Sequence, residues 1–65
     1  MYKHYEKWNA TFKVIDNNKI LKYYSLDFLA IDYKKAFQWA LSQATHDNLN
    51  TNETSFVSVF SVNKK

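Results

Sequence analysis

The chain has 65 residues, a net charge of +3 and no Cys, Gly, Pro or Arg, while aromatic residues make up 18% of it. A chain of this length forms a single domain, residues 1–65, and buries only about 60% of the surface that its unfolded state exposes. It has no Cys, no signal peptide, and no apolar run of the roughly 18 residues that cross a bilayer, which predicts a cytoplasmic protein without membrane contact. We expect residues 1–5 and 63–65 to be loosely held.

The positive charge is carried by lysine alone. It permits contact with nucleic acid or with an acidic protein surface. Arg is favoured for bidentate contacts with phosphate, carboxylate and guanine, so its absence argues against specific recognition of these groups. Frequent Lys and Asn without Arg also matches the codon usage of an AT-rich genome, which accounts for the composition without a functional cause.

The first two elements form a predicted β-hairpin. Apolar and polar side chains alternate over residues 8–15, which is typical of a strand with one buried face. Residues 16–19 read Asp-Asn-Asn-Lys and predict a turn, because Asn tolerates positive φ better than most residues. The β-branched and aromatic residues of the segment 20–28 predict the second strand.

The polarity of the two strands selects the hairpin register. A loop of two or four residues would mix the two faces and place two lysines opposite each other. A loop of three or five residues instead pairs Phe12 with Tyr24 and separates the faces. One face then carries Trp8, Ala10, Phe12, Val14, Tyr24, Leu26 and Phe28, and the other carries Asn9, Thr11, Lys13, Ile15, Leu21, Tyr23 and Ser25. We therefore predict an odd loop, with Asn18 or Lys19 in the left-handed conformation.

Asp32 predicts the start of a helix, since its carboxylate can accept hydrogen bonds from the first free amide groups. Apolar residues at helical spacing follow and predict a helix over about 33–45. They are Tyr33, Ala36, Phe37, Ala40, Leu41 and Ala44. Trp39 falls away from the centre of this stripe, so we expect it on a flank or the outer face, where Trp often binds a partner. The alternative is that it lies over the sheet edge and completes the core.

Residues 46–54 are polar and predict a loop, and residues 55–62 alternate again and predict a third strand. We expect its larger apolar side chains to face the helix, namely Phe56, Phe60 and Val62. Val57 and Val59 then face the other way. If the strand is turned over, the two phenylalanines are exposed instead, and the exposed apolar surface is larger.

These elements predict an α+β fold of order ββαβ. The helix crosses over between the second and third strands, and a right-handed crossover places the third strand beside the first. The result is a three-stranded antiparallel sheet of order 2-1-3 with one helix packed on one face. No segment remains to cover the opposite face.

The uncovered face is the predicted binding surface. Several apolar groups on one exposed sheet face approach the size of patch that marks an interaction site, although half-exposed β-branched residues are also ordinary in strands. The predicted partner-binding residues are Lys13, Ile15, Leu21, Tyr23, Trp39, Val57 and Val59. Homodimerisation through the same face is a competing use, because exposed strand edges pair readily.

Catalysis finds little support in the sequence. Without Gly there is no phosphate-cradling loop of the usual kind, and without Cys there is no thiol nucleophile. His46 and Asp47 at the predicted end of the helix suggest a general base, but a histidine at a helix end is commonly a dipole contact only. His4 has no metal-ligand spacing to His46. We therefore expect no enzyme activity, no cofactor and no metal.

Binding of single-stranded or double-stranded nucleic acid is the alternative function. Tyr23 and Lys13 on the open sheet are similar to the stacking surface of RNA-recognition domains. The signature segment of those domains is absent, and the lysines are spread over several elements, so we rank this function below protein binding.

Three stretches resemble the small host-takeover proteins of bacteriophages, in particular the phage inhibitor of bacterial RNA polymerase, which has a similar element order. The stretches are Lys7-Trp8-Asn9-Ala10-Thr11, Ala30-Ile31-Asp32-Tyr33-Lys34-Lys35-Ala36-Phe37 and Phe56-Val57-Ser58-Val59. Those inhibitors rely on arginines in and near the last strand, which this chain lacks, so no functional residue is carried over. The resemblance implies a compact binder in the host cytoplasm that inhibits or regulates a host protein, such as a transcription or defence component. Phage inhibitors of uracil-DNA glycosylase have a similar order but are acidic DNA mimics, and the net charge of +3 argues against that class.

Overall fold

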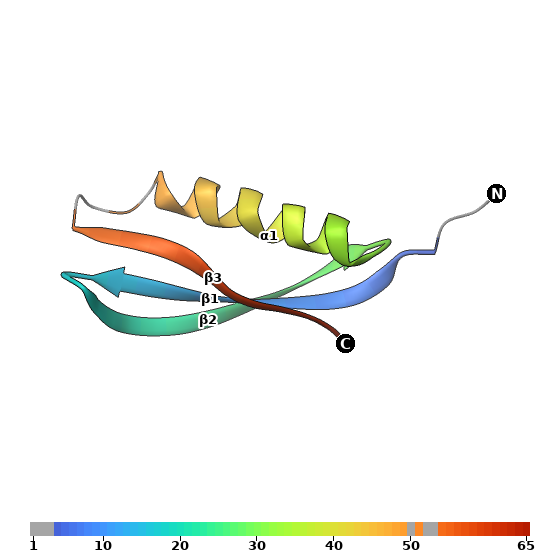
Figure 1. The fold of residues 1–65 in the computed structure, drawn as a ribbon, viewed down its shortest axis with the longest axis horizontal. Coiled ribbons are helices and arrows are strands. Elements are labelled where there is room, and N and C mark those ends of the chain that lie inside the picture. Colours follow the sequence, from blue (N-terminus) through green and yellow to red (C-terminus); the bar gives the residue numbers. More distant parts are fainter. Residues whose placement is uncertain (1–3, 50, 52–53) are drawn as a thin grey trace.

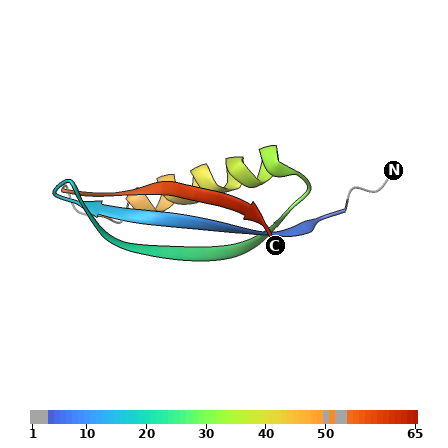
Figure 2. The ribbon, with the colours of Figure 1, turned by 60° about the horizontal axis from the view of Figure 1, so that its bottom comes forward.

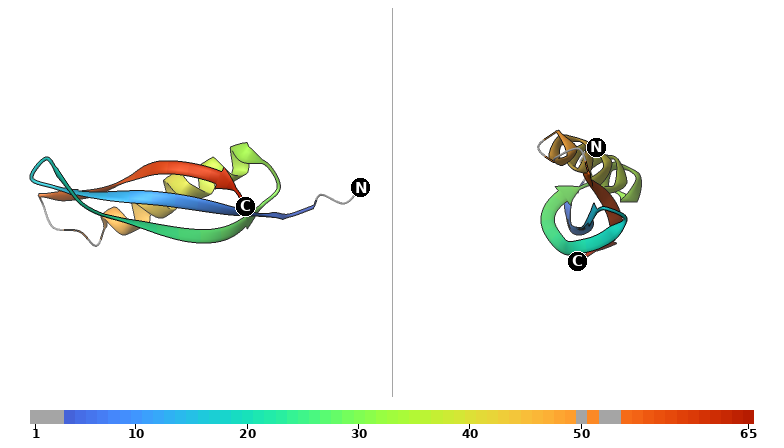
Figure 3. Two further views of the ribbon diagram at one scale, coloured as in Figure 1. Left: turned by 90° about the horizontal axis from the view of Figure 1, so that it is seen from below. Right: turned by 90° about the vertical axis from the view of Figure 1, so that its left-hand side faces the viewer.

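The computed structural model describes residues 4–49, 51 and 54–65, and it contains four elements (Figure 1). They are β1 (Glu6–Asp16), β2 (Lys19–Ala30), α1 (Tyr33–Asn48) and β3 (Ser55–Lys64). The strands form one antiparallel sheet of order β2-β1-β3. Seen from the side away from the helix, α1 lies behind the sheet and crosses it obliquely (Figure 2, Figure 3). The predicted α+β class, the ββαβ order and the strand order are confirmed.

A two-residue turn closes the hairpin, so the predicted odd loop is wrong. Asp16 pairs with Lys19, and Asn17 and Asn18 lie between them. Both asparagines have positive φ, 51° and 65°, which is the combination that a type I′ hairpin turn requires. Asn18 is therefore left-handed as predicted, whereas Lys19 begins a strand.

A β-bulge beside the turn restores the predicted register. The pairing of β1 with β2 shifts between Val14 and Ile15, which leaves Leu21 without a partner in the ladder. One extra residue in a strand shifts the pairing as an extra loop residue would. Beyond the bulge Phe12 pairs with Tyr24, as predicted. The side chains expected on the core face of the hairpin are all buried or packed against the core: Trp8, Ala10, Phe12, Val14, Tyr24, Leu26 and Phe28.

The third strand faces opposite to our main expectation over residues 56–60, whereas Val62 faces the core as predicted. Val57 and Val62 are buried and Val59 packs against the core, whereas Phe56 and Phe60 are exposed. The pairing of β3 with β1 shifts by one residue at Phe60, and this second bulge lets Val59 and Val62, three positions apart, both face the helix. The alternative in which the phenylalanines are exposed is the one observed.

The N-terminus of α1 is capped as predicted. The Asp32 Oδ1 atom accepts a hydrogen bond from the Lys35 backbone N–H at 2.9 Å. The helix runs to Asn48, beyond the predicted end at about residue 45. Within the described residues, no helix is long and apolar enough to cross a membrane.

The helix packs on the sheet through its alanines. Ala36, Ala40 and Ala44 are buried and recur at a spacing of four residues, which places them in one row along the helix. The larger members of the predicted stripe lie at the border of the contact and are exposed, namely Tyr33, Phe37 and Leu41. The distance between packed elements depends on the side chains at the contact. A row of alanines therefore brings α1 close to β3, whose valines face it, while the rings of Trp8 and Phe12 on β1 are buried in the same core.

Aromatic rings fill the flank of α1 over β2. Trp39 stacks on Phe28 with the ring centroids 4.0 Å apart and the planes 10° from parallel. Tyr24 stacks on Phe12 at 5.1 Å, and its hydroxyl donates a hydrogen bond to the Asp47 carboxylate. Burial, together with this bond and the charge of Asp47, raises the pKa of Tyr24 above its ordinary value. Trp39 thus completes the core at the sheet edge and is not on the outer face of the helix.

The hairpin turn predicts different effects for two substitutions of Asn18. Asn18→Ala should lower the free energy of unfolding by about 1 kcal/mol, because Ala lacks the short polar side chain whose local hydrogen bonds let Asn tolerate the left-handed conformation. Asn18→Gly should leave it unchanged or raise it slightly, since Gly adopts positive φ freely. Urea denaturation measures both, and an equal loss in the two variants would contradict a turn with positive φ at this position.

Tyr24→Phe should lower the free energy of unfolding by about 1 kcal/mol at neutral pH, because one net hydrogen bond is lost. The raised pKa keeps the phenol protonated in the folded state at a pH where the unfolded chain already loses the proton. Its contribution is therefore complete below the ordinary Tyr pKa of 10.0 and is lost as the pH rises toward the folded value. Urea denaturation across this range should show the wild type and the variant converging; a constant difference would refute the assignment.

Candidate functional site

The open face of the sheet has a polar half, toward the start of β1 and the end of β3. Thr11 Oγ1 lies 3.0 Å from Ser25 Oγ on the neighbouring strand. Asn9 Nδ2 donates to Asp27 Oδ1 at 2.8 Å, and Lys65 Nζ donates to Asp27 Oδ2 at 2.9 Å. These side chains form hydrogen bonds with one another across the strands, so this half offers few free polar groups to a partner.

The half toward the hairpin turn is apolar. Five side chains from all three strands gather there, and we call them the apolar patch: Ile15, Ile20, Tyr23, Phe56 and Phe60. Tyr23 and Phe60 come from the two outer strands and meet edge to face, with ring centroids 5.1 Å apart. Ile15 of the central strand pairs with Ile20 on one side and with Phe56 on the other. All but Ile15 are between 49% and 57% exposed, so the patch is open to a partner.

The apolar patch includes part of the predicted binding surface. Ile15 and Tyr23 belong to it, and Lys13 pairs with Tyr23 on β2 and with Ser58 on β3, which places it among them. Leu21 is the bulged residue beside the patch and is 65% exposed. The structure therefore brings these four predicted residues to one end of the sheet.

The other three predicted residues lie in or against the core. Val57 is buried, and Val59 and Trp39 pack against the buried cluster. Phe56 and Phe60 were expected to be exposed only in the alternative orientation of the third strand, and the exposure of Ile20 was not predicted. The two phenylalanines were expected inside because of their size, but the alanine row of the helix lies close to β3 and valines fill the space between them. That row was the signal in the sequence that favoured the valines.

One lysine shares the open face with the apolar patch. Lys13 pairs with Tyr23, whereas Lys22 pairs with the buried Val14 and therefore lies on the helix side of the sheet. In the described part of the chain, the two ion pairs lie at the far end of the sheet and do not involve Lys13. Lys13 thus adds a positive charge to the patch that suits an acidic group of a partner.

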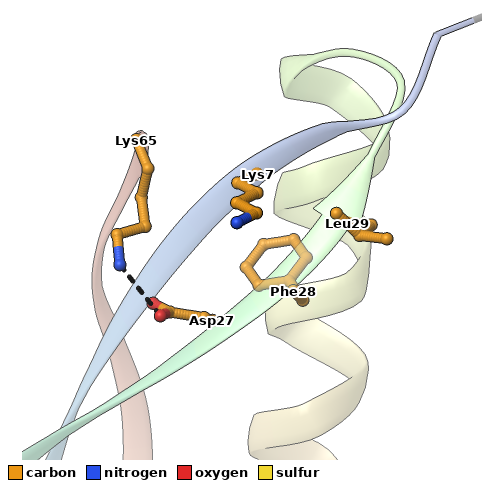
Figure 4. A pocket seen from close by; sticks show the side chains of 5 residues that line it. All are labelled: Lys7, Asp27, Phe28, Leu29 and Lys65. Atoms are coloured by element: carbon orange, nitrogen blue, oxygen red, sulfur yellow. Dashed lines mark hydrogen bonds and ion pairs between the residues drawn. The ribbon is translucent and has the colours of Figure 1, made fainter.

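A depression lies at the opposite end of the sheet from the apolar patch (Figure 4). Its volume is about 380 Å³, and it is lined by Lys7, Asp27, Phe28, Leu29 and Lys65. The hydrogen bonds from Asn9 and Lys65, with the charges of Lys65 and Lys7, hold the pKa of Asp27 below its ordinary value. Asp27 is therefore an ionised structural acceptor, and its neighbours provide neither a nucleophile nor a general base.

The residues considered for catalysis do not form a reactive constellation. His46 is exposed in the last turn of α1. The carboxylate of the adjacent Asp47 is engaged by the Tyr24 hydroxyl and by Gln43 Nε2, the latter at 3.1 Å. Among the residues that the structure describes, no three His, Asp or Glu side chains come together as a metal site.

Comparisons with known proteins give no relative for this chain. No protein-family model, no curated protein and no solved structure matches it. The similarity in element order to phage host-takeover proteins therefore stays a prediction, and function has to be inferred from the surface itself.

The two neighbouring tyrosines should differ sharply in their contribution to stability. Tyr24→Ala should lower the free energy of unfolding by about 3 kcal/mol, because it removes a ring packed in the core. Tyr23→Ala should cost much less, since this ring is half exposed on the open face. Thermal melts of the two variants measure the order, and a larger loss for Tyr23→Ala would mean that the faces of β2 are reversed.

Proposed function

We propose that this protein is a non-enzymatic binder that docks its apolar patch on a partner protein and thereby inhibits or regulates it. One observation carries the proposal: apolar side chains from all three strands converge on a sheet face that no helix or strand of the described residues covers. The element order makes a phage-type protein that acts on a host transcription or defence component the favoured class. Its site of action is then the host cytoplasm.

The exposed area of the apolar patch is sufficient to support an interface. Covering a half-exposed side chain of this size contributes about 1 kcal/mol. The patch has four such side chains close together, and a few clustered apolar anchors dominate most protein interfaces. The Tyr23 and Phe60 rings already pack against each other, so little side-chain entropy remains to be lost on binding.

The charge of Lys13 narrows the class of partner protein. Lys13 lies among the apolar side chains of the patch, and complementary charge raises the association rate and excludes wrong partners. We therefore propose a partner surface that combines an apolar region with an acidic group opposite Lys13. The absence of a reactive constellation around His46 and Asp27 is consistent with a binder that performs no chemistry.

Nucleic-acid binding is the second candidate, and the aromatic pair favours it. Tyr23 and Phe60 are half-exposed rings on an open sheet with Lys13 between their strands, which is a surface on which bases can stack. The aliphatic side chains of Ile15 and Ile20 occupy the rest of the patch and offer nothing to a base. Protein binding therefore remains the favoured function.

A matched pair of double variants tests the proposal. Tyr23→Ser/Phe60→Ser removes the two rings of the apolar patch. Tyr33→Ser/Phe37→Ser removes a Tyr and a Phe that are also exposed and also stacked on each other, at 6.1 Å, but on the helix. In quantitative affinity purification from bacterial lysate, the wild type and the helix variant should recover one protein stoichiometrically, and the patch variant should lose it by at least tenfold.

Two outcomes would contradict protein binding through this surface. One is recovery of the same protein by the patch variant, and the other is the absence of any reproducible protein with the wild type. Fluorescence anisotropy with single- and double-stranded oligonucleotides decides the second candidate. Binding that falls steeply with salt and is lost in the patch variant alone would establish nucleic acid as the ligand.

A further inference from the structure

The outer strand β3 contains a palindromic sequence. Residues 55–61 read Ser-Phe-Val-Ser-Val-Phe-Ser, which is the same in both directions about Ser58. If this segment paired antiparallel with the same segment of a second copy about a two-fold axis at Ser58, every residue would face its own kind. Phe56 would lie opposite Phe60 of the second copy, and Val57 opposite Val59.

Over the palindrome, the edge formed by β3 has neither charge nor Pro to protect it against such pairing, and the bulge at Phe60 lies near one end of the palindrome, away from its centre at Ser58. No charged residue occurs from Ser55 to Asn63, and the chain has no Pro. The other outer strand, β2, carries Lys19, Lys22 and Asp27, and charges of this kind are a common defence of sheet edges. An uncharged segment of valines and phenylalanines is also typical of strands that associate when exposed.

Two side chains close this edge, because Thr51 Oγ1 also donates to the Ser55 carbonyl oxygen, at 3.1 Å. The main closure is the amide of Asn48. The Val57 N–H donates to Asn48 Oδ1 at 2.6 Å, and Asn48 Nδ2 donates to the Val57 carbonyl oxygen at 2.9 Å. The backbone groups of Val57 therefore point away from β1, and the amide of Asn48 occupies them as a neighbouring strand would. Asn48 is the last residue of α1, so the helix end covers the strand edge directly.

We infer that β3 is a self-complementary docking edge for a second copy of this chain, and that Asn48 holds it closed in the monomer. Release of Asn48 frees Val57 to pair with Val59 of the second copy. The product is a six-stranded antiparallel sheet with both helices on one face, because a two-fold axis normal to the sheet preserves its faces. The apolar patches of the two copies then adjoin through Phe56 and Phe60.

Removal of the Asn48 amide is the first test. Asn48→Ala should convert the monomer into a concentration-dependent dimer in sedimentation equilibrium, whereas Asn63→Ala, the same change beyond the palindrome, should remain monomeric. Ser58→Lys in the Asn48→Ala background should restore the monomer, because it places two like charges opposite each other at the axis. A folded Asn48→Ala variant that stays monomeric at millimolar concentration would overturn the inference.

A single cysteine tests the register. The backbone groups of Val57 and Val59 point outward, away from β1. In the dimer, Ser58 would therefore face Ser58 of the second copy in a non-hydrogen-bonded pair. The Cα atoms of such a pair are about 4.5 Å apart, which is close enough for a disulfide between two cysteines. Asn48→Ala/Ser58→Cys should form a disulfide-linked dimer on oxidation, and Asn48→Ala/Ser42→Cys, with the cysteine on the exposed side of α1, should not. If Asn48→Ala fails to fold, Ser58→Cys alone should crosslink slowly through transient release of the edge. Crosslinking no faster than that of Ser42→Cys alone would then refute the inference.

Discussion

The close contact between the alanine row of α1 and β3 determines which face of the third strand is buried. Ala36, Ala40 and Ala44 bring the helix near enough that the valines of β3 fill the space opposite it. The rings of Trp8 and Phe12 on the central strand are buried in the same core, and the remaining rings are distributed around it. Trp39 and Phe28 stack on the flank over β2, Tyr33 and Phe37 stack on the helix surface, and Phe60 lies on the open face. The exposed rings of β3 are thus a consequence of valines facing the alanine row, and the proposed binding surface depends on them.

Two one-residue bulges adapt the strands to this core. A two-residue turn alone would place the apolar side chains of β1 and β2 on opposite faces. The bulge at Leu21 shifts the pairing by one residue, so that they share one face. The bulge at Phe60 keeps Val59 and Val62 on the helix side and turns the ring outward to meet Tyr23. Both irregularities border the apolar patch, in agreement with the tendency of bulges to aim side chains at functional surfaces. The patch is therefore built by the same local features that define the core.

The sequence was sufficient for the fold and for part of the site. Alternation of polarity in β1 and β2 is asymmetric, because Trp8, Phe12 and Val14 share one side, and it predicts the hairpin register correctly. In β3 both faces carry apolar residues, Phe56 and Phe60 on one side and Val57 and Val59 on the other, so polarity cannot distinguish the faces, and side-chain size favoured the wrong one. The predicted helix stripe was centred too near its rings, because it followed hydrophobicity and not side-chain volume. Bulges leave no mark in polarity patterns, which explains why the length of the hairpin turn was predicted wrongly.

Asparagine performs backbone roles that other proteins assign to glycine and proline. This chain has neither, and Asn17 and Asn18 adopt the left-handed turn that would usually contain Gly. Asn48 covers a strand edge that other proteins protect with Pro or with charge. The abundance of Asn therefore cannot be a matter of codon usage alone, because at these three positions the amide or the tolerance of positive φ is required by the fold. An edge closed by the hydrogen bonds of Asn48 and Thr51 is also more easily opened than one protected by charge, and this links the composition of the chain to the proposed self-association.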